Sequence, residues 1–153
     1  MVSRLVVAIL AAATVQQAEA QGASPLLTDE KVREALQIAL KNIDRARCEG
    51  LQSCAPATPG ELRAPPISLE QARAAMRAGL ASGGMEWCRL DWQQRSFRPM
   101  MDHHRTTLGL NERQMALMGL LHGMHQGMVA RTMGNRECTP EMRAKLQPPR
   151  GGP

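Results

Sequence analysis

Two short clusters combine methionine with histidine at helical spacing, and these are the residues whose types could do chemistry. The candidate ligands are Met100, His103 and His104 in the first cluster, and Met118, His122 and His125 in the second. Residues three and four apart share one face of an α-helix. Thioether and imidazole without carboxylates are donors that favour copper, particularly Cu(I). If the two helical faces meet, the six side chains predict a copper site.

The same residues have a simpler interpretation as packing. The chain contains 11 methionines but one phenylalanine and no tyrosine, and methionine readily fills irregular gaps in a core. Histidines on such helices would then make ordinary polar contacts. We take packing as the leading interpretation, with no resident cofactor, and keep copper binding as the alternative.

Residues 97–133 resemble a family of exported helical proteins of unresolved function, some of which are associated with copper. The likeness comes from a Phe…Met-x-x-His-His pattern followed by a second motif, carried here by Phe97, Met100, Met101, His103, His104, Gln126 and Met133. Val129 stands where the family has an acidic residue. The resemblance implies a helical fold, and it is a reason to measure copper binding.

Sequence signatures of common enzymes are missing. The chain has no His-Glu-x-x-His, no Gly-x-Ser-x-Gly and no glycine-rich phosphate loop. Asp102 precedes His103, but helical neighbours point ~100° apart and do not form an acid–base pair through adjacency. We therefore expect a non-catalytic binding or structural role.

A protein partner is possible, although the sequence does not identify one. Trp87 and Trp92, with Arg89 and Arg95 nearby, are residue types that dominate binding hot spots. The alternative is that both tryptophans anchor the core near Cys88. Nucleic acid is disfavoured, because the net charge of +5 comes from scattered residues and few aromatic side chains are present for base stacking.

Residues 1–20 are typical of a cleaved signal peptide. Arg4 provides a positive start, residues 5–13 form a short apolar core, and Ala18-Glu19-Ala20 is a small-x-small cleavage site. The apolar run is about half the ~20 residues that span a bilayer, and no segment after Gln21 is apolar enough to span one. We expect a soluble product without a membrane span, exported to the bacterial periplasm or the medium.

An even number of cysteines in an exported chain predicts two disulfides. The four are Cys48, Cys54, Cys88 and Cys138. Spacing favours a local Cys48–Cys54 bridge and a long Cys88–Cys138 bridge, but it leaves the two crossed pairings open. A zinc site is disfavoured, since no Cys-x-x-Cys spacing occurs.

The element that must position most of these residues is a helix over residues 115–133. It is apolar almost all the way round, which is typical of a central packed helix. Gly119, Gly123 and Gly127 recur at every fourth residue, and we expect this face to allow close approach of another helix. Asn111 and Gln114 predict a capping box at its start.

Four further helices are expected around it, which gives an all-α fold: a small bundle of four to five helices around the Met/Gly-rich helix. Their predicted ranges are 29–47, 68–81, 85–108 with a kink or break at Pro99, and 139–146. Residues 48–66 are predicted to be a loop. Its two cysteines would constrain it by a bridge within the loop, with no link to another element, so that it is pinned only to itself. One domain would cover residues 21–146, and 147–153 would be a disordered tail.

Overall fold

The computed structural model describes residues 24–147, except 49 and 51, and is all-α with two disulfides. The predicted fold class is therefore confirmed. The helices are α1 (Asp29–Lys41), α2 (Pro59–Arg63), α3 (Leu69–Trp87), α4 (Arg98–Asp102), α5 (Glu112–Met133) and α6 (Pro140–Leu146). The predicted signal peptide and residues 148–153 of the predicted tail lie outside the described residues.

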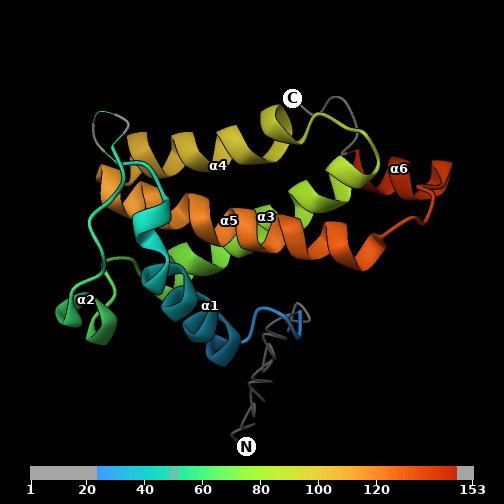
Figure 1. The fold of residues 1–153 in the computed structure, drawn as a ribbon. Helices are drawn as coiled ribbons and strands as arrows, with labels where there is room; N and C mark the ends of the chain where they lie inside the picture. The colour runs from blue at the N-terminus through green and yellow to red at the C-terminus, as the bar shows by residue number, and fades with distance from the viewer. Residues whose placement is uncertain (1–23, 49, 51, 148–153) are drawn as a thin grey trace, which may run out of the picture.

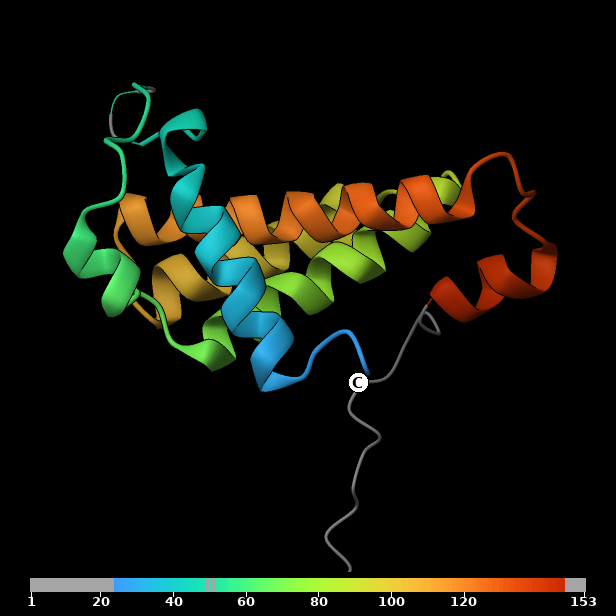
Figure 2. The same cartoon turned by 60° about the horizontal axis from the view of Figure 1, so that its bottom comes forward.

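The long helices α3 and α5 form the centre of the fold. They lie side by side and run in the same direction, while the segment that contains α4 connects them and runs alongside the pair in the opposite direction (Figure 1). Helix α1 crosses the pair near one end (Figure 2). The largest fully buried side chains come from these helices and the turn after α1: Val32, Leu36, Leu40, Ile43, Met76, Met115, Leu117, Met118 and Leu121.

Close approach between α3 and α5 depends on glycines of α3. A Cβ atom on Gly79 would collide with the carbonyl oxygen of His122, and one on Gly83 would lie 2.6 Å from the Cβ of Val129. By contrast, a Cβ on Gly119 or Gly123 would meet nothing within 4 Å. The prediction that the glycine face of α5 is the close-contact surface is thus wrong.

The length of α3 was also predicted incorrectly. The helix continues through Gly83 and Gly84 to Trp87, whereas the Ser82-Gly83-Gly84 sequence predicted its end. A glycine costs a helix about 1 kcal/mol relative to alanine. Packing against α5 offsets that cost, because only a residue without a side chain fits at Gly83.

The segment after α3 begins later than predicted, because Cys88 ends α3 and Arg89 turns the chain with φ 55°. A π-helical turn, Gln93–Phe97, leads into α4, and a second one, His103–Thr107, follows it. The Arg98 N–H bonds to the Gln93 carbonyl five residues back, which widens the turn before Pro99. Proline is therefore accommodated where a break or kink was expected.

The structure differs from the prediction at two other places along the chain. Helix α1 ends at Lys41, and a 3₁₀ turn, Ile43–Arg45, follows in place of a continuous helix to Arg47. The predicted loop contains α2, whose start is capped by a reciprocal pair of hydrogen bonds between Thr58 and Glu61. This Thr-x-x-Glu capping box was visible in the sequence and was missed.

Both preferred disulfide pairings are confirmed. The Cys48–Cys54 bridge closes the loop before α2, but that loop is not pinned only to itself. From α5, the Arg113 guanidinium donates to the Ala55 carbonyl at 2.8 Å and to both carboxylate oxygens of Glu61 at 2.5 and 2.9 Å. In the part of the chain that the structure describes, no helix combines the length and apolar character that a membrane crossing requires.

Candidate functional site

The four histidines among the six predicted copper ligands do not gather at one point. His103 is exposed on the π-helical turn after α4, whereas His104 is buried. The His104 Nδ1–H donates to the Met100 carbonyl at 2.8 Å, a bond within one helical turn. Among residues 24–147, with 49 and 51 apart, no three His, Cys, Asp or Glu side chains come close enough to hold a metal ion.

His122 is a core residue between α3 and α5. Its Nε2 lies 2.8 Å from the Ser82 hydroxyl, and its ring packs against Phe97 and Trp92 with centroid distances of 4.7 and 5.8 Å. Burial, with a smaller contribution from nearby His125, lowers the pKa of His122 to about 4. The ring is therefore neutral at physiological pH and, with the buried Met118, supports the packing interpretation.

The two tryptophans hold segments together. Trp92 stacks on His122, and the Trp87 indole N–H donates to the Arg136 carbonyl at 2.8 Å. Arg136 is two residues from Cys138, which is bonded to Cys88 at the end of α3. Both tryptophans are half-buried and lie outside the hydrophobic core, so they act as links between segments and not as the predicted core anchors.

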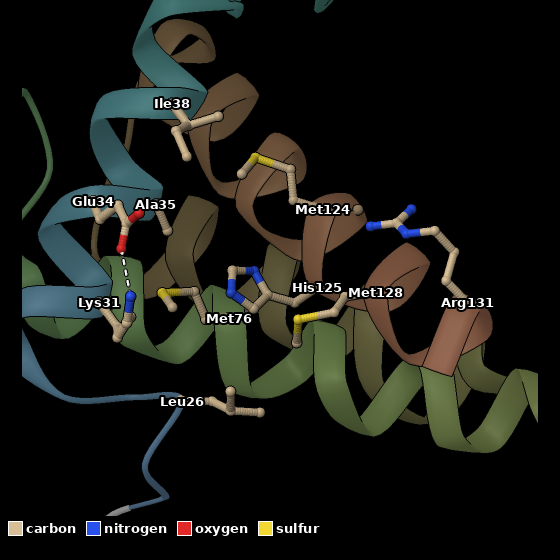
Figure 3. A pocket seen from close by; sticks show the side chains of 11 residues that line it. Leu26, Lys31, Glu34, Ala35, Ile38, Met76, Met124, His125, Met128 and Arg131 are labelled. Atoms are coloured by element: carbon tan, nitrogen blue, oxygen red, sulfur yellow. Dashed lines mark hydrogen bonds and ion pairs between the residues drawn. The ribbon is translucent and has the colours of Figure 1, made fainter. Parts of the chain in front are cut away.

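His125 differs from the other predicted ligands because it borders a groove. Its side chain is 9% exposed, and its Nδ1 lies 2.8 Å from the Leu121 carbonyl. A carbonyl only accepts hydrogen bonds, so Nδ1 carries a proton, and in the neutral ring Nε2 keeps a lone pair. In Figure 3 the ring extends from α5 into the space below α1.

The groove lies between α1, α3 and α5 and has a volume of about 410 Å³. Its walls are mostly apolar. The apolar lining residues are Leu26, Ala35, Ile38, Met76, Met124 and Met128. Leu26 and Ile38 stand at its mouth and are 45% and 44% exposed, so large apolar side chains face solvent where a ligand would enter.

Charged residues form the rim. Lys31 and Glu34 on α1 make an ion pair of 2.8 Å, and Arg131 of α5 stands at the other end of the groove (Figure 3). Gly123 lines the groove with open space where a side chain would be. The arrangement can enclose a small apolar or soft ligand against His125.

Comparisons with protein-family models, curated proteins and solved structures find no match to this chain. The resemblance of residues 97–133 to a copper-associated family is thus not accompanied by a family match. The case for function rests on the groove.

Sequence reasoning identified His125 but missed its methionine neighbours in the groove. Met124 and Met128 flank His125 in sequence and could have been found from their i, i+4 spacing. Met76 comes from α3, and no local signal connects it with His125. Only the packing of α3 on α5 places these side chains at one groove.

Proposed function

We propose that this protein is an exported, non-catalytic binding protein whose ligand occupies the groove between α1, α3 and α5. The observation that carries the proposal is the combination of apolar walls, an open mouth and the unpaired lone pair of His125 at one place. Pockets of this kind, mostly apolar with few polar groups, are typical ligand sites. The other predicted site histidines are exposed, as His103 is, or occupied by packing contacts.

The accessibility of the polar groups supports binding over catalysis. Ser82 and His122 form a hydrogen-bonded pair of the residue types used in nucleophilic catalysis. However, the Ser82 side chain is 0% exposed, so its hydroxyl is not offered to a substrate. The pair acts as a polar contact between two helices.

Export is supported by the cysteines. Both disulfides join residues of the folded domain, and such bonds persist in oxidising compartments. Together with the signal-peptide pattern of residues 1–20, this favours the bacterial periplasm or the extracellular space.

A site-filling substitution tests the proposal. We expect the uncharged dye Nile red to fluoresce on binding the wild-type groove, and Gly123→Leu to weaken that binding severalfold, because the new side chain enters the open space at Gly123. Gly119→Leu is the matched control. It makes the same change on the same helix, also into open space, but away from this groove.

Equal dye binding by the wild type and Gly123→Leu would overturn the proposal, as would a loss confined to Gly119→Leu. Circular dichroism of the three proteins checks that the helices are retained.

A further inference from the structure

We propose that the ligand of this groove is a fatty acid, whose carboxylate binds Arg131 while its alkyl chain lies along the methionine-rich walls. The inference rests on the proposed function, because it names the ligand class of the same site. It starts from two glycines of α5, Gly123 and Gly127, at which an added Cβ atom would meet no other helix.

The first step is the position of the Arg131 guanidinium. Gly123, Gly127 and Arg131 are spaced at i, i+4 and i+8, so they share one face of α5. A Cβ atom on Gly127 would lie 3.3 Å from Nη1 of Arg131, which shows that the arginine side chain folds back over this glycine. In Figure 3 the guanidinium lies beside Met124 at one end of the groove. The glycines therefore make room for a cation and for a group bound to it.

The second step is the distribution of charge around the groove. Arg131 forms no ion pair with a carboxylate in the part of the chain that the structure describes. At the opposite end, the Glu34 carboxylate is held by Lys31 at 2.8 Å. Nε2 of His125 is an acceptor in the neutral ring and cannot donate to a carboxylate. A guanidinium binds a carboxylate through two parallel hydrogen bonds, so the anionic group of a ligand is favoured at Arg131.

The third step concerns the rest of the ligand. The walls between the two ends carry no side-chain hydrogen-bond donor: Leu26, Ala35, Ile38, Met76, Met124 and Met128. A peptide in this groove would leave backbone N–H and C=O groups without partners, which costs free energy. An alkyl chain has no such groups, and flexible methionine side chains adapt to its shape. The volume of about 410 Å³ suits a single small ligand.

The test is isothermal titration calorimetry of the disulfide-intact chain with decanoate and with decanol, which has the same chain length without the charge. We expect one decanoate per chain. Arg131→Gln should weaken decanoate binding by roughly 10- to 100-fold, as expected for the loss of a hydrogen bond to a charged group, and leave decanol binding unchanged. Arg98→Gln is the matched control. It removes the same charge from an exposed position on α4, away from the groove, and should bind decanoate as wild type does.

A second measurement locates the ligand in the wild-type protein. With methyl-¹³C methionine labelling, decanoate should shift the signals of Met124 and Met128 and leave that of Met142, which is exposed on α6, unchanged. A shift confined to Met142 would overturn the inference.

Two further results would overturn it. One is an equal loss of decanoate affinity in Arg131→Gln and Arg98→Gln, and the other is an equal loss of decanoate and decanol affinity in Arg131→Gln. Failure to bind decanoate while Gly123→Leu still abolishes Nile red binding would overturn the inference and leave the proposed function standing. Failure of the wild type to bind either decanoate or the dye would overturn both.

Discussion

The Ser82 hydroxyl and Nε2 of His122 meet at 2.8 Å between α3 and α5, at the place where Gly79 allows the backbones to approach most closely. A neutral imidazole is required there, because the site is buried and the pKa of His122 is lowered to about 4. We therefore expect this contact between α3 and α5 to weaken when His122 is protonated.

The first prediction concerns acid. The unfolded chain protonates His122 near its ordinary pKa of 6.5, whereas the folded chain resists protonation down to about 4. The stability associated with neutral His122 is present above pH 6.5 and is lost as pH falls from 6.5 toward 4, with a slope of up to about 1.4 kcal/mol per pH unit. Urea unfolding at pH 7.5, 5.5 and 4.5 measures this slope.

His122→Gln should lower stability at pH 7.5 and flatten the dependence, while His103→Gln, a change at an exposed position, should keep the wild-type slope. Identical slopes in wild type and His122→Gln would contradict the prediction.

The second prediction concerns the glycines. Gly79→Ala places a methyl group against the His122 carbonyl, and overpacking of this kind costs about 1–3 kcal/mol. Gly119→Ala faces open space and should stabilise by up to about 1 kcal/mol through helix propensity. The melting temperature should therefore fall for Gly79→Ala and rise for Gly119→Ala. A gain in stability for Gly79→Ala would refute the assignment of Gly79 to the close contact between α3 and α5.

The third prediction concerns the connection between Arg113 and Glu61. The hydrogen bonds from Arg113, followed by that from the Thr58 backbone, lower the pKa of Glu61 to about 2. Arg113→Met should destabilise the protein by about 1.5–3 kcal/mol, the range for hydrogen bonds to charged groups. Urea unfolding at pH 7 measures the loss, and hydrogen exchange should show faster opening around α2.

The pH dependence of unfolding provides the control for the Arg113–Glu61 pair. The stability from ionised Glu61 is present above about pH 4.5 and is lost as pH falls toward 2. Between these values the difference between wild type and Arg113→Met should shrink. A constant difference would show that Arg113 acts through packing alone.

The fourth prediction compares the two disulfides. Cys88–Cys138 spans 50 residues of sequence and Cys48–Cys54 spans 6. In the chain-entropy model these loops correspond to about 4 and about 2 kcal/mol. The Cys88→Ser/Cys138→Ser variant should therefore melt well below the Cys48→Ser/Cys54→Ser variant, and the reverse order would show that local constraint at α2 matters more than loop length.

Much of the local structure followed from the sequence because its causes are local. Ser68 with Gln71, and Asn111 with Gln114, form the capping boxes that were predicted for α3 and α5. A capping box depends on side chains three residues apart, so no distant contact is needed to recognise it. The all-α class and the preference for a short Cys48–Cys54 bridge depended on similarly short-range patterns.

The tertiary structure decided which faces of the helices meet. Periodicity identified glycines at every fourth residue of α5, but the identity of the partner helix determined that Gly79 and Gly83 of α3 make the close contact. For the same reason the predicted His103 and His125 do not converge, while Met76 reaches the groove beside His125. Spacing along one helix specifies which side chains share a face, whereas the opposing face comes from a segment far away in sequence, and its choice depends on the packing of the whole core.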